Sequence, residues 1–191
     1  MRITFSENGD YSFDPANRTV EDLLQEQVGW EQMSSLVCDD IANLYQTMGF
    51  HGFKRMERYE SRGEAEEARC LRKLIYDVAS ARTTVDLVYS ALPVSATLKG
   101  IMEWKKLWYE ANLKRLSAIM GIAIATEKFP YISWLQKAID CQTCKLKDLV
   151  KAMQGIEIAG WDNGHHLMVL NAALHRRYKK KEKNDQHADI E

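Results

Sequence analysis

Apolar residues recur every three or four positions over four long stretches of the chain, as they do along the buried face of a helix. The pattern predicts helices over about 20–48, 53–80, 98–128 and 132–154, and a shorter fifth helix over about 165–178. The chain has only three prolines, and they fall where these patterns break. The hydrophobic pattern therefore predicts an all-α protein.

The connections predict how these helices are arranged. Residues 49–53, "GFHGF", make a short turn between the first two helices, and Pro130 ends the third helix just before the fourth, so both pairs should be antiparallel. Residues 81–98 have no helical period, and roughly seventeen extended residues reach ~50 Å. That length is enough to run along the bundle and make the second and third helices parallel. We therefore predict a ferritin-like four-helix bundle with a long crossover between helices two and three and a short fifth helix.

Length and charge place the chain among ordinary globular proteins. Its 191 residues suit one domain, which we divide into an N-terminal extension (1–19), a bundle (20–178) and a basic, polar, flexible tail (179–191). A formal net charge of −1 argues against a nucleic-acid partner, since domains that bind nucleic acid are usually strongly basic. We expect the basic run "HRRYKKKEK" in the tail to be solvated.

The N-terminus and the cysteines indicate a cytoplasmic protein. No basic start precedes an apolar run, and the most apolar stretch, 116–125, is far shorter than the ~20 residues of a membrane span. We therefore expect no membrane association and reduced thiols at all four cysteines. Cys141 and Cys144 form a C-x-x-C, but it lies inside a helical pattern, which disfavours a redox or zinc role.

A few inward positions of the predicted bundle are polar. They are Glu31 on the first helix, Glu60, Glu64 and Glu67 on the second, Tyr109 and Glu110 on the third, and Gln142 on the fourth. Burying an ionised carboxylate without a partner costs several kcal/mol or more, so converging acids require cations. Carboxylates on facing helices of such bundles, two of them at i and i+3, hold metal pairs, and hard oxygen ligands suit iron and manganese.

The same residues also fit a plainer interpretation. The stretch "GEAEEARCLRKL" can form a solvated acidic face, with Glu64 or Glu67 paired to a neighbouring arginine. Glu31 can be an acid at a helix edge, and Gln142 a core amide with satisfied hydrogen bonds. The residues alone leave both interpretations open.

The order of several segments resembles the bacterial-type, non-haem ferritins. "EQVGWEQMSS" (26–35) is similar to the family's first helix, "GFHGF" falls on its turn, and "EAEEA" (64–68) falls on its E-x-x-H. "YISWLQKAIDCQ" (131–142) resembles the family's F-x-F-L-Q followed by E-Q, and "IEIAGWDNGHHLMVL" (156–170) resembles the turn before its fifth helix. The similarity covers roughly residues 20–174, and its segments keep their order and spacing.

This resemblance implies a set of iron ligands. Glu31 matches the first iron ligand, Glu64 the bridging carboxylate, and Gln142 the glutamine beside the second iron. Glu67 stands where the family has a histidine ligand. With Glu110 as the contribution of the third helix, these are the predicted metal ligands of a di-iron site, which other divalent metals could also occupy.

Several positions depart from the family pattern and imply a modified, impaired centre. The glutamate of the family's third helix aligns with Tyr109, whereas Glu110 lies one residue on, about 100° around the helix. Cys38 replaces a tyrosine near the site. The acids of the family's accessory third iron site are replaced by Cys141, Cys144 and Lys145.

The resemblance implies a ferroxidase and iron-storage function. Fe(II) would be oxidised by dioxygen or peroxide at the metal pair, and Fe(III) would be stored as a mineral inside a homo-oligomeric shell of 24 subunits. The alternative is a degenerate ferritin-like bundle that acts as a structural or protein-interaction module without ferroxidase activity. For subunit contacts we expect the apolar residues Trp104, Tyr131, Leu167 and Val169.

Overall fold

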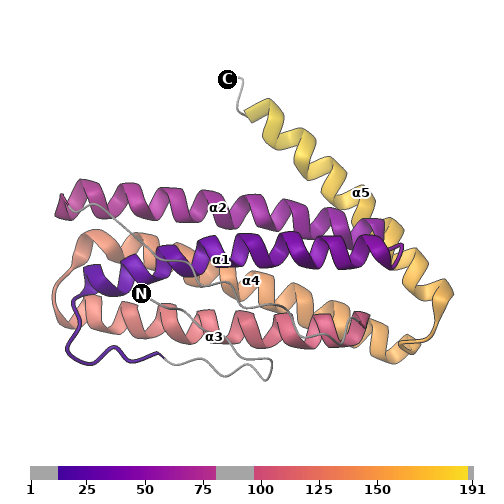
Figure 1. The fold of residues 1–191 in the computed structure, drawn as a ribbon, viewed down its shortest axis with the longest axis horizontal. Helices are drawn as coiled ribbons and strands as arrows, with labels where there is room; N and C mark the ends of the chain where they lie inside the picture. The colour runs from indigo at the N-terminus through magenta and orange to yellow at the C-terminus, as the bar shows by residue number, and fades with distance from the viewer. Residues whose placement is uncertain (1–12, 81–96, 189–191) are drawn as a thin grey trace.

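The computed structural model describes residues 13–80 and 97–188, and within these ranges the chain forms five helices and no strand. The helices are α1 (Val20–Thr47), α2 (His51–Ala79), α3 (Leu98–Ala125), α4 (Phe129–Ala159) and α5 (Gly164–Ala188). The first four lie side by side as a bundle, and α5 crosses one end of it (Figure 1). The prediction of an all-α four-helix bundle is confirmed.

The helices run in the predicted directions. α1 and α2 form one antiparallel pair, and α3 and α4 form a second (Figure 1). α2 ends at one end of the bundle and α3 begins at the other, so these two helices are parallel. Most of the predicted crossover, residues 81–96, lies outside the described residues.

Local sequence explains where the helices begin. Thr19 caps α1 in a reciprocal capping box: its hydroxyl accepts from the backbone N–H of Asp22, whose carboxylate accepts from the backbone N–H of Thr19. Thr97 caps α3 by accepting from the backbone N–H of Gly100 at 3.1 Å. Pro130 stands in the first turn of α4, where its missing N–H costs nothing.

α5 is longer than predicted, because it continues to Ala188 instead of ending near Tyr178. Its first half packs closely on the start of α2, where Asn171 Oδ1 accepts from the Gly52 backbone N–H at 2.6 Å. Only glycine fits there, since a Cβ on residue 52 would lie 1.8 Å from the Asn171 carbonyl oxygen.

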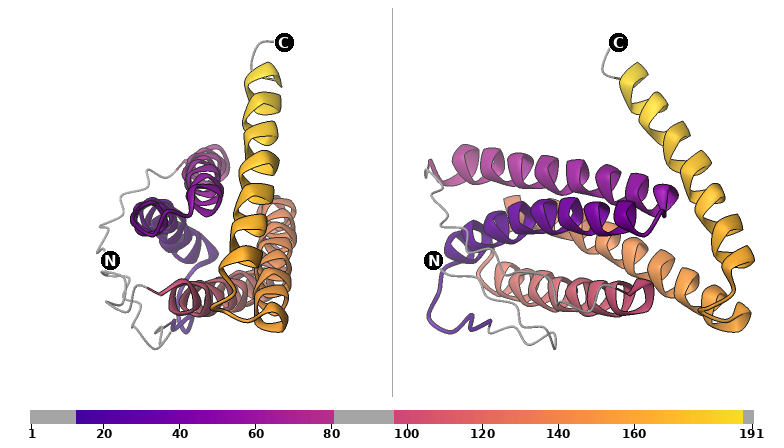
Figure 2. Two further views of the ribbon diagram at one scale, coloured as in Figure 1. Left: turned by 90° about the vertical axis from the view of Figure 1, so that its right-hand side faces the viewer. Right: turned by 45° about the vertical axis from the view of Figure 1, so that its right-hand side comes forward.

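Contacts with α2 explain why the basic stretch is helical. Glu182 accepts from Arg55 at 3.1 Å and from Arg62 at 2.6 Å, and the Tyr178 and Tyr59 rings lie 5.4 Å apart. The segment predicted as a flexible tail from residue 179 is thus helical through residue 188. The outer end of α5 rises away from the bundle (Figure 2).

The apolar core is divided into two clusters along the bundle. On α2, Phe53 belongs to one cluster, and Ala68, Leu71 and Ile75 belong to the other. The first cluster contains a stack of tryptophans, with the Trp30 and Trp108 rings 4.2 Å apart. The stretch of α2 between the two clusters carries glutamates.

Most of the residues predicted to make subunit contacts belong to this core. Trp104, Tyr131 and Leu167 are buried within the chain, so the prediction was wrong for these three. They pack in the two apolar clusters between the helices. Val169 is 54% exposed and remains available for a subunit contact.

Candidate metal centre

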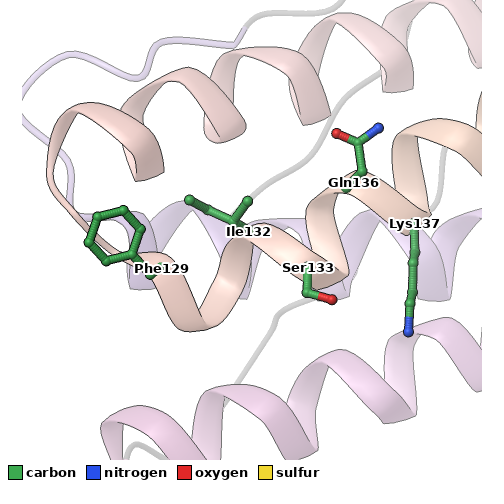
Figure 3. A pocket seen from close by; sticks show the side chains of 5 residues that line it. All are labelled: Phe129, Ile132, Ser133, Gln136 and Lys137. Carbon is green, nitrogen blue, oxygen red and sulfur yellow. The ribbon is translucent and has the colours of Figure 1, made fainter.

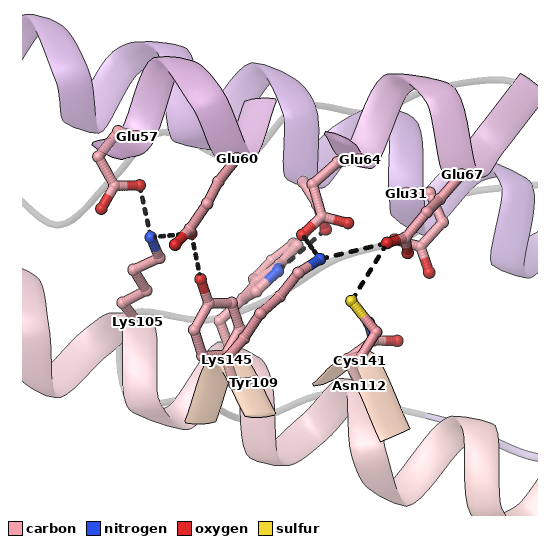
Figure 4. Close-up of polar contacts among 12 residues, drawn as sticks. Glu31, Glu57, Glu60, Glu64, Glu67, Lys105, Tyr109, Asn112, Cys141 and Lys145 are labelled. Atoms are coloured by element: carbon pink, nitrogen blue, oxygen red, sulfur yellow. Dashed lines mark hydrogen bonds and ion pairs between the residues drawn. The ribbon is translucent and has the colours of Figure 1, made fainter. Parts of the chain in front are cut away.

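Glu57, Glu60, Glu64 and Glu67 project from one face of α2 into the middle of the bundle (Figure 4). Their spacing of three, four and three residues keeps them on one side of a helix with 3.6 residues per turn. The sequence predicted the last three as inward residues and missed Glu57, which lies three residues before Glu60 and is fully buried.

The first carboxylate group joins α1 to α2. Oxygen atoms of Glu31, Glu64 and Glu67 lie within 4.8 Å of one another. Glu31 Oε1 accepts from Gln27 Nε2 at 2.5 Å. Glu31 Oε2 and Glu64 Oε2 are buried, and neither accepts a hydrogen bond from the part of the chain that the structure describes. The structure thus brings together three of the predicted ligands.

Lys145 from α4 enters this group. Its Nζ lies 2.8 Å from Glu64 Oε1 and 3.5 Å from Glu67 Oε1 (Figure 4). The Cys141 thiol, one turn earlier on α4, lies 3.5 Å from the same Glu67 oxygen. The sequence marked Lys145 only as a replacement for an acid, whereas the structure places its charge among the carboxylates.

A second group lies one turn earlier on α2. Lys105 of α3 donates to Glu57 at 2.5 Å and to Glu60 at 2.6 Å, and the Tyr109 hydroxyl donates to Glu60. Ligand atoms of Cys38, Glu57 and Glu60 also lie within 4.8 Å of one another. Lys105 was missed from the sequence, although its position four residues before Tyr109 places it on the same face of the helix.

Electrostatics in the first group favour an added positive charge. Burial, followed by the charges of Glu64 and Glu67, raises the pKa of Glu31 well above its usual value. Burial and the Glu64 charge also raise the pKa of Glu67. Burial opposes the charge on Lys145, but Glu64 and Glu67 outweigh it and raise the pKa of this lysine. The lysine stays charged, and the remaining carboxylates hold a proton or bind another cation.

The second group is closer to electrical balance. Burial raises the pKa of Glu57 to about 7, even though the Lys105 charge opposes this shift. Burial also acts against ionisation of Glu60, but Lys105 and the Tyr109 hydroxyl prevail and lower its pKa. Below about pH 7, where Glu57 is protonated, its charge and those of an ionised Glu60 and a charged Lys105 sum to zero, so this group has little need of a metal ion.

A buried network of polar side chains orients Glu31. The Gln27 amide donates to Asn112 Oδ1 at 2.8 Å as well as to Glu31, and its oxygen accepts from Arg115 Nε at 3.1 Å. Arg115 also pairs with Glu26 at 2.8 Å, and burial lowers the pKa of this arginine to about 9. Partners of this kind fix the direction in which a ligand oxygen points.

Of the two remaining predicted ligands, Gln142 is buried and Glu110 is partly exposed. Gln142 is buried on α4 next to Cys141, and its Nε2 has no acceptor among the described residues. The structure does not bring Glu110 into the group, because Tyr109 takes the inward position on α3. Glu110 is 39% exposed and lies 3.7 Å from Lys106.

A pocket at the surface contains none of these residues. It is a shallow hollow lined by Phe129, Ile132, Ser133, Gln136 and Lys137 at the start of α4 (Figure 3). It is open to solvent and contains no carboxylate. This hollow therefore offers no oxygen ligands comparable with those inside the bundle.

Comparisons with known proteins identify the fold. No protein-family model and no curated protein matches the sequence. Among solved structures, an open pore ferritin from the hyperthermophilic archaeon Archaeoglobus fulgidus matches with a TM-score of 0.76 and 16% identity, over 84% of this chain and 98% of that one. A humanized archaeal ferritin matches with a TM-score of 0.75 and 16% identity, over 86% and 98%. The chain has a ferritin-like fold.

A third match is a closed form of the Archaeoglobus fulgidus ferritin made by site-directed mutagenesis, with a TM-score of 0.74 and 16% identity over 86% of this chain and 97% of that one. Identity at this level shows the fold alone. None of the helices that the structure describes is long and apolar enough to cross a membrane.

The ferritin-like bundle of this chain fits one divalent cation better than two. Glu31, Glu64 and Glu67 offer hard oxygen ligands from two helices, and buried oxygens in this group have no donor within the described ranges. For a second ion, α3 supplies no carboxylate, since Tyr109 faces inward and its hydroxyl is bonded to Glu60. The described residues thus do not supply the second half of the predicted pair.

Proposed function

We propose that this chain is a ferritin-like iron-binding protein that takes up Fe(II) between Glu31, Glu64 and Glu67. The observation that carries the proposal is the pair of buried oxygens, Glu31 Oε2 and Glu64 Oε2, which accept no hydrogen bond from the described part of the chain. An uncompensated buried carboxylate costs several kcal/mol. A divalent cation bound there would remove this cost, with the Gln142 amide nearby on α4.

Iron is the metal that fold and ligands together favour. Carboxylate oxygens suit hard cations such as iron and manganese, and thiols do not dominate the group. Iron is then a substrate and a cargo. It is taken up at the centre and stored in a homo-oligomeric shell in the cytoplasm, with 24 subunits as the family resemblance implies. Exposed apolar residues near the turn from α4 to α5, including Ile158, Met168 and Val169, are available for subunit contacts.

We expect the oxidation of Fe(II) at this centre to be slow. The described side chains offer too few ligands for a second ion. They therefore cannot hold two iron ions side by side as a complete di-iron site does. Glu67 in place of a histidine makes the ligand set more anionic, which favours Fe(III) over Fe(II) once iron is bound. Slow oxidation followed by storage is the activity that this combination supports.

The second candidate is a bundle with a structural or protein-interaction role and no ferroxidase activity. The observation that favours it is the placement of Lys105 and Lys145 inside the bundle, where each bonds two glutamates. These ammonium groups let the bundle hold the four inward glutamates of α2 without any metal.

Anaerobic titration of Fe(II) followed by calorimetry separates the two candidates. We expect saturable binding of one ion per chain at the centre, and loss of this binding in Glu31→Gln and Glu64→Gln. Glu66→Gln is the matched control, because Glu66 is exposed on the same helix and pairs with Arg69. Absence of saturable binding, or equal binding by all variants, would favour the second candidate.

The size of the particle tests the storage part of the proposal. We expect light scattering to give a large closed assembly at micromolar concentration. A species of the 22.0 kDa chain mass would contradict storage in a shell while leaving metal binding by the bundle unaffected.

A further inference from the structure

The Lys145 ammonium lies where it contacts the same carboxylates that the proposed metal ion would use. Its Nζ is 2.8 Å from Glu64 Oε1 and 3.5 Å from Glu67 Oε1, and these contacts join α4 to α2. The side chain is 16% exposed, so it is not sealed completely inside the bundle. A hydrogen bond between an ammonium and a carboxylate is among the stronger polar interactions in a protein.

We propose that Lys145 is a tethered competitor for the metal ion, which lowers the affinity of the centre and makes the binding of each ion reversible. This inference rests on the proposed metal site. A divalent ion that bonds to Glu64 Oε2 and to Glu67 uses the same two carboxylates as the ammonium, which contacts Glu64 Oε1 and Glu67 Oε1. The two positive charges cannot share these carboxylates at close range, since like charges repel strongly where water is excluded. Lys145 therefore leaves the carboxylates when the metal ion binds and returns to them when the ion departs.

The neighbouring group shows how the arrangement of Lys145 differs from a permanent ion pair. Lys105 is 3% exposed and lies between Glu57 and Glu60, with the Tyr109 hydroxyl bonded to Glu60 as well. The Lys145 side chain is the more exposed of the two, at 16%. Lys105 thus holds its carboxylates permanently, whereas Lys145 holds Glu64 and Glu67 only until a cation of higher charge arrives.

The consequence suits a protein that takes up iron and passes it on. A centre with several buried carboxylates and no internal cation would bind a divalent ion tightly and release it slowly. The ammonium of Lys145 supplies a replacement charge at the moment of release, so the carboxylates are not left uncompensated. Lys145 is a positioning residue in this account, because it acts on the ligands and never on the metal ion itself.

Mn(II) binding measured by electron paramagnetic resonance tests this inference. Mn(II) prefers oxygen ligands, so the free cysteines do not compete for it, and the signal of the free ion reports both affinity and stoichiometry. We expect Lys145→Met to bind Mn(II) at least tenfold more tightly than the wild-type chain. Lys147→Met is the matched control, since Lys147 is exposed on the same helix, and it should bind as the wild type does. Lys145→Gln removes the charge but keeps an N–H donor, and it replaces the methionine variant if that variant does not fold.

The outcomes distinguish this inference from the proposed function. Binding by Lys145→Met but not by the wild-type chain would support competition by Lys145 and contradict metal uptake by the natural protein. Equal affinity in the wild type and Lys145→Met, an equal gain in Lys147→Met, or no binding by any variant would overturn the inference. A melting-temperature increase on adding Mn(II) that is larger in Lys145→Met than in the wild type is the second expected result.

Discussion

Gln27 Nε2 donates to Glu31 Oε1 at 2.5 Å and to Asn112 Oδ1 at 2.8 Å, so one amide ties the carboxylate of α1 to α3. The Gln27 oxygen is held in turn by Arg115. Asn112 and Arg115 thus fix the Gln27 amide group, and this amide in turn holds Glu31 Oε1. The other oxygen of the carboxylate, Oε2, remains for a metal ion.

The first prediction follows from this relationship. Gln27→Ala removes the donor that orients Glu31, and partners of this type typically change metal affinity by about 10- to 100-fold. We expect Mn(II) to bind at least tenfold more weakly, with little change in stoichiometry. Gln32→Ala, on the same helix and only half-buried, is the control. An unchanged affinity in Gln27→Ala would mean that Glu31 is not a ligand or needs no orientation.

The second prediction concerns the stability that Lys105 provides. Lys105→Met leaves Glu57 and Glu60 without their ammonium partner, and breaking a buried ion pair from one side costs about 3–5 kcal/mol. Urea unfolding at neutral pH should show a loss of this order. Lys106→Met should change the free energy of unfolding by under about 1 kcal/mol, because the Lys106 side chain is 43% exposed. Equal losses in both variants would contradict the assigned role of Lys105.

The third prediction is a pH dependence from Glu57. Its pKa rises from 4.5 in the unfolded chain to about 7 in the folded one, so the folded state binds the extra proton. Stability from this residue is therefore full below pH 4.5 and is lost as the pH rises through 7, by about 3 kcal/mol in total. Glu57→Gln cannot ionise and should show a smaller loss of unfolding free energy between pH 5 and pH 8 than the wild type. Parallel slopes for the two proteins over this range would refute the shifted pKa.

The sequence predicted more of the fold than of the candidate site. The apolar period predicted α1 over 20–48, and the structure gives Val20–Thr47, since Thr19 and the turn at Gly49 mark both ends. The extra turns of α5 were not predictable in this way. Its last described part is polar and basic, and it is held by pairs such as Glu182 with Arg62, whose members are 120 residues apart in sequence.

Only the acidic residues of the candidate site could be predicted from the sequence. Glu64 and Glu67 share a face of one helix, so their spacing alone places them together. Lysines usually lie on the surface, and the pairs of Lys105 with Glu57 and of Lys145 with Glu64 span 48 and 81 residues. Nothing in local sequence marks such pairs, and the internal positive charges therefore came only from the structure.

The fourth prediction concerns the rate of Fe(II) oxidation. In the presence of the wild-type chain, Fe(II) should be oxidised faster than free Fe(II) in the same buffer. The reaction should still be slow, because α3 supplies no ligand for a second ion. Glu67→His together with Tyr109→Glu supplies the ligand types that the resemblance implies and should speed the reaction, as stopped-flow absorbance would show. An unchanged rate in the double variant, or a wild-type rate no faster than free Fe(II), would argue against oxidation at this centre.

The most direct measurement of the central claim is anomalous scattering at the iron edge, from crystals soaked in Fe(II) under nitrogen. The proposed site predicts one strong peak between the carboxylates of Glu31, Glu64 and Glu67, with the Lys145 ammonium moved away from Glu64. It also predicts no peak between Glu57 and Glu60, where Lys105 remains bound. Two peaks of similar height at the centre, or no peak with Lys145 still in contact with Glu64, would contradict it.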